Sequence, residues 1–204
     1  MLSGTMNAFA SEAAVDWTYR LSAFGGTSEE VFHDGKKDGT MTATLSDGGQ
    51  VAKTSMVLDG KVYFEGNALG LDELENLTAA VADKEAGHWI AVPRSSAYFR
   101  DYSNDLTVGS AVEELYLGGS VEVLPTTTFK GQPAFVVKEA VTSKGTTVDE
   151  TIYIRATGLE LPLQVLLTVD GVSGAIVYGP WGKPPAAKVP VKSVPFQSTW
   201  LGKS

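Results

Sequence analysis

From Val15 onward, apolar and polar residues alternate along much of the chain, and Asp-Gly pairs punctuate the alternation. In the first such stretch, Val15, Trp17, Tyr19 and Leu21 alternate with polar residues. A period of two is that of a strand with one buried face. Asp-Gly favours the tight turns of two-residue hairpins, and it occurs at Asp34-Gly35, Asp38-Gly39, Asp47-Gly48 and Asp59-Gly60. The segment 15–66 is therefore predicted to be an antiparallel meander.

The period changes to three or four in the middle of the chain. Leu71, Leu74, Leu77 and Val81 recur at helical spacing with acidic residues between them, and Gly87 follows as a stop signal. A second apolar stripe precedes Gly118-Gly119 and consists of Ala111, Val112, Leu115 and Tyr116. We therefore predict a helical middle over 71–118, with helices at roughly 71–85 and 106–117 on either side of a short strand, HWIAVP.

Alternation returns over 119–180, which is predicted to be a second run of strands. An Ala-rich helix is expected over 1–14, and an extended tail over 181–204. Pro180 is expected to stop strand pairing, with Trp181 covering the end of the sheet and Pro184-Pro185 holding the chain extended along an edge. Strands, helices and strands without a linker indicate one α+β domain.

Composition excludes several classes of function. The 204 residues contain no cysteine, which rules out disulfides, thiolate catalysis and Cys-ligated metals. The net charge is −8, and Lys36-Lys37 is the only adjacent basic pair. The sequence thus disfavours nucleic acid and anionic headgroups as partners. No apolar run is long enough to span a bilayer.

Signatures of catalysis are missing as well. There is no G-x-S-x-G motif, and GPWGKP lacks the spacing and the Ser/Thr of a phosphate-binding loop. His33 and His88 each stand alone, while Asp72-Glu73 and Glu113-Glu114 fit solvated helix faces. We predict that the protein is not an enzyme and has neither a cofactor nor a metal site.

Four local motifs carry a resemblance that covers nearly the whole chain by order and spacing. They are D-G-K-V-Y at 59–63, W-I-x-V-P at 89–93, F-K-G-Q-P-A at 129–134 and I-Y-I-x-x-x-G-L-x-L-P-L at 152–163, followed by a W-G-K-P tail. In this order the chain is similar to bacterial lipoproteins of the LppX/LprG type, which share the fold of the lipoprotein carrier LolA. The resemblance implies a single curved antiparallel half-barrel sheet with helices on its concave face.

The resemblance also implies a binding function in the cell envelope. It suggests an exported protein, tethered to the outer face of the cytoplasmic membrane through an N-terminal lipid anchor, that carries a lipid or lipidated ligand. The residues alone leave two possibilities, a cytosolic protein or one whose export signal precedes Met1, and the resemblance implies a lipidated cysteine before Met1 as well. The alternative function is an envelope lipoprotein with a filled core that acts through protein–protein contact. A monomer is favoured.

Sequence periodicity does not distinguish a filled core from a hollow one. If the helices leave the concave face partly uncovered, an apolar ligand pocket forms there. The expected lining consists of apolar residues from the strands and from both helical stripes: Trp17, Tyr19, Phe64, Leu74, Leu77, Val112, Leu115, Phe135, Tyr153 and Val165.

Overall fold

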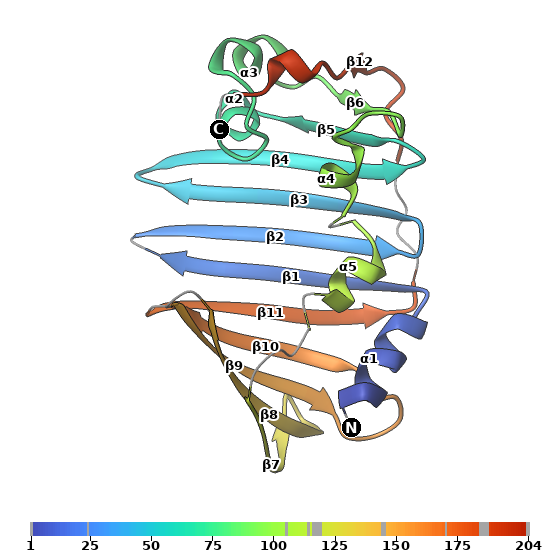
Figure 1. The fold of residues 1–204 in the computed structure, drawn as a ribbon, viewed down its shortest axis with the longest axis vertical. Coiled ribbons are helices and arrows are strands. Elements are labelled where there is room, and N and C mark those ends of the chain that lie inside the picture. Colours follow the sequence, from blue (N-terminus) through green and yellow to red (C-terminus); the bar gives the residue numbers. More distant parts are fainter. Residues whose placement is uncertain are drawn as a thin grey trace.

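Twelve strands form one open, curved sheet in the computed structural model (Figure 1). The structure describes residues 2–23, 25–104, 106–113, 115, 120–143, 146–169, 171–183 and 188–202. The strand order is β12-β6-β5-β4-β3-β2-β1-β11-β10-β9-β8-β7. All neighbouring strands pair antiparallel except β12 and β6, which are parallel. The predicted fold class is confirmed.

The strands fall into the two predicted runs. The first run is β1 (Ala14–Ala23), β2 (Gly26–Gly35), β3 (Asp38–Asp47), β4 (Gln50–Asp59) and β5 (Val62–Gly66), followed by the short β6 (Ile90–Val92). The second is β7 (Ser120–Phe129), β8 (Gln132–Ser143), β9 (Thr146–Arg155), β10 (Pro162–Val169) and β11 (Val172–Trp181), with the two-residue β12 (Val194–Pro195) near the C-terminus.

The Asp-Gly pairs lie at strand ends, as predicted. Asp34 and Gly35 end β2, Asp38 and Gly39 begin β3, and Asp38 pairs with Asp59 at the end of β4. Gly60, in the turn that follows, has φ 68°, a conformation that glycine adopts without the steric cost of a Cβ. Two of these turns, Lys36-Lys37 and Gly60-Lys61, therefore lie at the same end of the sheet.

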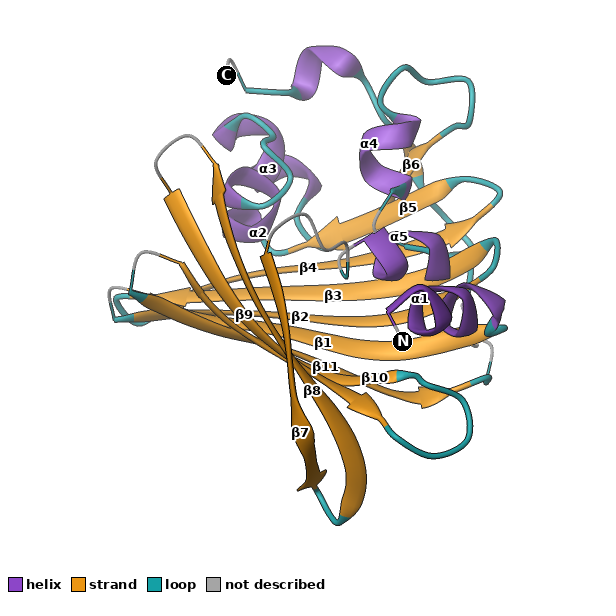
Figure 2. Ribbon diagram, turned by 60° about the horizontal axis from the view of Figure 1, so that its bottom comes forward, coloured by secondary structure: helices purple, strands orange, loops and turns teal. Residues whose placement is uncertain are grey.

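The short helices lie on one face of the sheet, across its concave side (Figures 1 and 2). They are α1 (Leu2–Ser11), α2 (Ala68–Glu73), α3 (Ala79–Glu85), α4 (Phe99–Ser103) and α5 (Val108–Glu113), and a 3-10 turn covers Ser198–Trp200. Among the described helices, none combines the length and the apolar character needed to cross a membrane.

The predicted continuous helix over 71–85 is wrong, because the chain breaks between α2 and α3. Asn76 has φ 53°, a left-handed conformation that interrupts the helix. Leu77 then turns inward, is 1% exposed, and forms a bridge with Leu201 in the C-terminal tail. The leucines have helical spacing, but burying Leu77 against a distant segment stabilises the fold more than a continuous helix over 71–85 would.

The second helical stripe is shorter than predicted. Of the helix expected over 106–117, the structure forms the six-residue α5, and the five-residue α4 is a separate helix that ends before this range. Leu115 is buried beyond the end of α5, whereas Tyr116, Glu114 and Gly118-Gly119 lie outside the described residues.

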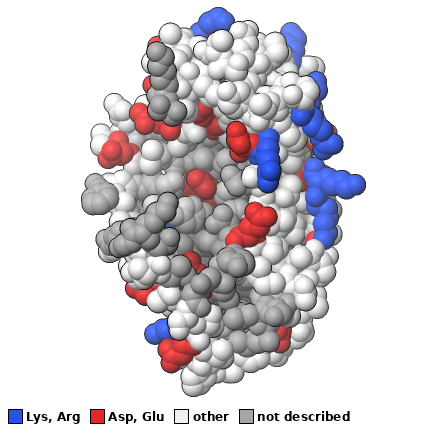
Figure 3. Space-filling model, in the orientation of Figure 1, with Lys and Arg blue, Asp and Glu red and all other residues white. Residues whose placement is uncertain are grey.

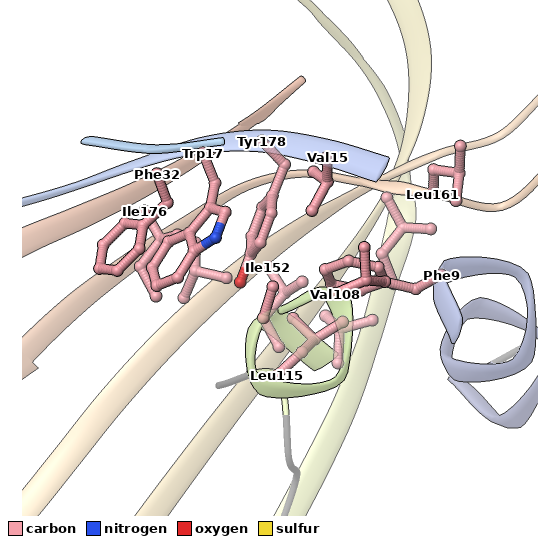
Figure 4. Close-up of a cluster of buried hydrophobic side chains, with 14 residues drawn as sticks. Phe9, Val15, Trp17, Phe32, Val108, Leu115, Ile152, Leu161, Ile176 and Tyr178 are labelled. Atoms are coloured by element: carbon pink, nitrogen blue, oxygen red, sulfur yellow. The ribbon is translucent and has the colours of Figure 1, made fainter. Parts of the chain in front are cut away.

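Two clusters of buried side chains form the core. The first joins α1, α5 and the strands β1, β2, β8, β9, β10 and β11, and Figure 4 shows it around Trp17 and Phe9. Trp17 stacks on Phe32, with ring centroids 3.8 Å apart. The second cluster lies under α2, α3 and α4 around Phe64, and Phe196, Trp200 and Leu201 of the tail pack against it. Most of the apolar inventory is thus used in packing.

The end of β11 departs from prediction. Pro180 does not stop strand pairing, because after a bulge Trp181 pairs with Val15 of β1. The Trp181 ring meets Phe9 of α1 edge to face, with centroids 5.0 Å apart, so it covers the core where α1 meets the sheet. Pro184-Pro185 lies outside the described residues.

Candidate ligand-binding groove

Two adjoining cavities lie on the concave face, and we call them together the inner groove. The larger, about 380 Å³, lies over β9, β10, β11, β1 and β2 beside α5. The smaller, about 260 Å³, lies over β2, β3 and β4 beside α4. Glu30 and Phe32 of β2 line both cavities.

Strand register explains why these side chains meet. Trp17, Phe32, Met41 and Met56 are successive cross-strand partners, so they form one row across β1 to β4 on the concave face. The next row is Tyr19, Glu30, Ala43 and Thr54. No described helix covers the larger cavity completely, and its far wall consists of Val148, Glu150, Leu167, Val169 and Ile176.

Carboxylates are the charged groups of this groove. Glu30 and Glu150 line the larger cavity, and Glu30, Glu75 and Asp101 line the smaller one, whereas no Lys or Arg is among the described lining residues. Acidic side chains are visible inside the hollow of the concave face in Figure 3. The groove therefore combines an apolar floor with a negative electrostatic potential.

Glu75 is the most perturbed of these acids. Its side chain is buried, and burial together with the nearby Glu30 raises the pKa of Glu75 to about 7, against a smaller lowering effect of the neighbouring Thr54 hydroxyl. Burial and the neighbouring Glu75 and Asp101 also raise the pKa of Tyr102. The raised pKa leaves a protonated form of Glu75 accessible near neutral pH, and this form can donate as well as accept a hydrogen bond.

Of the ten residues predicted to line a pocket, three line the inner groove. Trp17 and Tyr19 contribute to the larger cavity and Leu74 to the smaller one. Four others are fully packed in the core with at most 3% exposure: Phe64, Leu77, Leu115 and Val165. Val112 and Phe135 pack against the first core cluster.

Tyr153 points away from the groove. Its neighbours Ile152 and Ile154 are buried in the core, so strand alternation places Tyr153 on the opposite face of β9. There its ring stacks on Phe129, with centroids 4.3 Å apart.

Other lining residues were not among the ten predicted for the pocket, chiefly Glu30, Phe32, Met41, Glu75 and Leu167. The alternation of side chains along the strands could have identified two of them. If Trp17 and Tyr19 face inward, their cross-strand partners in the β1–β2 hairpin, Phe32 and Glu30, face inward as well. Glu75 carries no such signal, because its position depends on the break between α2 and α3.

Another hollow of the described surface lies outside the inner groove. It measures about 510 Å³, opens between β4, β5 and the end of α3, and is lined by small and polar residues such as Lys53, Ser55 and Glu65. It offers no large apolar side chain, so it suits an apolar ligand less well than the inner groove. Within the described ranges, no three His, Asp or Glu side chains converge as metal ligands.

The fold itself matches solved structures. No protein-family model matches the chain, and a sequence search of curated proteins finds no match. LprF from Mycobacterium bovis superposes with a TM-score of 0.58 at 11% identity, covering 93% of this chain and 94% of LprF. The lipoprotein LppX from Mycobacterium tuberculosis gives 0.50 at 8% identity, covering 92% and 96%. The resemblance predicted from sequence is thus confirmed as a shared fold: the chain has the architecture of LprF and LppX.

Proposed function

We propose that the protein binds a lipid or another apolar molecule in the inner groove and acts as a carrier in the cell envelope. The observation that carries this proposal is the pair of cavities left on the concave face between two filled core clusters. Cavities of a few hundred Å³ with aromatic and aliphatic walls are typical of small-molecule sites.

The energetics favour an apolar occupant. Trp17, Tyr19, Phe32, Leu167 and Ile176 line the larger cavity, and each buried CH₂ of a ligand would contribute about 0.8 kcal/mol. An acyl chain of about ten carbons gains several kcal/mol in this way, even after the cost of ordering it.

The carboxylates narrow the chemical class of this ligand. A free fatty acid would bring its own negative charge close to Glu30 and Glu150, which costs free energy in a partly desolvated site. A neutral lipid ester, or an amphiphile with a hydroxyl or amine headgroup, avoids this repulsion and can hydrogen-bond to the acids. The proposed cargo is therefore neutral or cationic.

The envelope location rests on the shared fold. LppX is a lipoprotein of Mycobacterium tuberculosis, and we extend an exported, envelope-associated role to this chain by analogy. An N-terminal lipid anchor belongs to the same proposal.

Adjacent residues of β10 provide the test. Leu167 lines the larger cavity, whereas Leu166 is 39% exposed on the opposite face of the same strand. Leu167→Trp should fill the cavity and reduce binding of a fluorescent neutral diacyl lipid at least tenfold, while Leu166→Trp should leave binding unchanged. Thermal unfolding of both variants checks that the fold survives.

Native mass spectrometry of the purified protein complements the binding assay by detecting co-purified acyl species. Equal binding by both Trp variants, together with a protein free of apolar mass adducts, would contradict the groove proposal. The alternative, action through protein contact, would then be favoured by the edge strand β7, where Val123 is 58% exposed.

A further inference from the structure

Folding gathers basic residues that are scattered along the sequence. Lys36 and Lys37 form the β2–β3 turn, Lys61 lies in the β4–β5 turn, and Arg94 follows β6. Val62, next to Lys61, pairs with Val92, so Lys61 and Arg94 emerge from adjacent strands. Basic side chains accordingly gather along the right-hand edge in Figure 3, the edge where these turns lie in Figure 1.

The C-terminal tail contributes to the same edge. At the end of β11 the Gly182 amide donates to the Ala14 carbonyl, and residues 188–193 lead into β12 beside β6 (Figure 1). Lys188 and Lys192 of this tail are exposed. We call Lys36, Lys37, Lys61, Arg94, Lys188 and Lys192 the basic rim. Acidic residues also lie close to the rim, among them Asp34, Asp38, Asp59 and Glu113, but they are fewer than its six cations, so the rim is positive although the chain carries a net charge of −8.

Part of the rim surrounds a hollow of about 360 Å³. Lys36, Lys37 and Arg94 line it, together with neutral side chains that can donate hydrogen bonds: Ser103, Asn104, Thr107 and Ser110. Glu113 is the acidic residue of the lining. The hollow adjoins the inner groove: Leu106 lines the groove, Thr107 lines the hollow, and Ser110 lines both.

Contacts within the protein hold two of these cations in place. The Lys36 Nζ donates to the Ala10 carbonyl of α1 at 2.5 Å. The Arg94 guanidinium lies over the Phe99 ring, 5.7 Å from its centroid, within the range of a cation–π interaction. Held in this way, the cations lose less side-chain entropy when they meet an anion.

An apolar side chain projects beside the rim. Val191 is 99% exposed between Lys188 and Lys192, and Val189 is 40% exposed. A fully exposed valine contributes no free energy of hydrophobic burial to folding. Next to lysines, such a side chain suits the boundary between lipid headgroups and acyl chains.

We propose that the basic rim is the surface that docks on an anionic phospholipid bilayer, with lipid phosphates near the Lys36–Lys37–Arg94 hollow and Val191 at the acyl boundary. Charge complementarity carries this assignment: clusters of four to eight basic residues are what bind anionic lipid surfaces. The linear sequence disfavours anionic headgroups as partners because it contains no run of Lys and Arg. The basic cluster forms only when the chain folds. Docking through the rim is independent of what occupies the inner groove.

Vesicle flotation tests the proposal with the full 204-residue chain. It should bind vesicles of 70% phosphatidylcholine and 30% phosphatidylglycerol but not pure phosphatidylcholine, and added salt should weaken binding. The variant Lys37→Gln/Lys61→Gln/Arg94→Gln should lose roughly 100-fold at low salt, because each basic residue near an anionic surface contributes about fivefold. Val191→Ser should also weaken binding.

The matched control neutralises three exposed cations away from the rim: Lys53→Gln/Lys130→Gln/Lys138→Gln. Its net charge equals that of the rim variant, and Lys130, like Arg94, lies over an aromatic ring, Phe129. This control should bind vesicles like the parent. Equal losses in both triple variants, equal binding to both vesicle types, or binding to nucleic acid without vesicle binding would each overturn the proposal. Native mass spectrometry of the rim variant reports groove occupancy separately, so the two proposals fail independently.

Discussion

The indole Nε1 of Trp17 donates a 2.6 Å hydrogen bond to Oδ2 of Asp34, and both side chains are buried. The bond ties β1 to β2 beside Phe32, on the same face of the sheet as the row Trp17, Phe32, Met41 and Met56. It also satisfies part of a carboxylate that is 0% exposed. A buried hydrogen bond to a charged acceptor is worth more than one between neutral groups.

Breaking this bond should destabilise the fold. Trp17→Phe removes the donor as well as some ring volume, so we expect a loss of about 2–4 kcal/mol in the free energy of unfolding. Urea unfolding of Trp17→Phe, Asp34→Asn and the double variant gives the coupling energy, for which we expect about 1–3 kcal/mol. Strict additivity of the two single changes would show that the bond contributes nothing to stability.

Glu75 should make stability depend on pH. Its pKa is raised from 4.5 to about 7 in the folded protein, so between these values the folded state binds more protons than the unfolded state. The free energy of unfolding then falls as pH rises from about 4.5 to 7, by on the order of 3 kcal/mol from this group.

Glu75→Gln should remove this dependence, because the amide does not titrate. The variant should be more stable than the parent at pH 8 and close to it at pH 5, as measured by urea unfolding at both pH values. Identical pH profiles for parent and variant would contradict the assigned shift. Glu30, Asp101 and Tyr102 line the same cavity and stay unchanged in this comparison.

Two helical glycines make a matched pair. A Cβ on Gly70 of α2 would lie 2.2 Å from the carbonyl oxygen of Lys53 in β4, because Asn67 holds α2 against that strand through hydrogen bonds to the amides of Lys53 and Gly70. On Gly109 of α5, the nearest atom would be Thr107 Oγ1 at 3.5 Å.

Alanine should therefore have opposite effects at the two sites. Gly70→Ala should cost about 2–4 kcal/mol through overpacking, whereas Gly109→Ala should be neutral or stabilise by up to about 1 kcal/mol through helix propensity. Thermal unfolding compares them directly. If Gly70→Ala were as stable as Gly109→Ala, α2 would not contact β4 this closely.

The C-terminal tail should contribute to stability through its aromatic residues. The Phe196 ring lies 5.6 Å from that of Tyr98 and 5.9 Å from that of Tyr102, centroid to centroid. Phe196→Ala should cost about 2 kcal/mol, less than for a fully buried phenylalanine. Val191→Ala, at a fully exposed site of the same tail, should stay within about 0.5 kcal/mol of the parent. Equal stability of both variants in urea would mean that the tail does not seal the second core cluster.

The strands and their turns could be predicted from sequence because their signals are local. Alternation around Trp17 and Tyr19 records which face is buried, and each Asp-Gly pair encodes its own turn, so the meander and its register follow from neighbouring residues. The α+β class followed from the order of strands and helices, whereas the curved half-barrel was implied by the resemblance to LppX/LprG-type lipoproteins.

Only the tertiary structure decided the helix break, the lining of the groove and the basic rim. Each of these depends on residues that are far apart in the sequence and meet only when the chain folds. Leu77 lies in the break between α2 and α3 and forms a bridge with Leu201. This break places Glu75 in the groove beside Glu30. The ends of the short helices decide which apolar residues fill the core and which line a cavity. Leu115 is therefore buried in the core, whereas Tyr19 lines the larger cavity of the inner groove. Likewise, Lys37, Lys61 and Arg94 are unremarkable in the chain and become one charged edge because strand pairing brings their turns to the same end of the sheet.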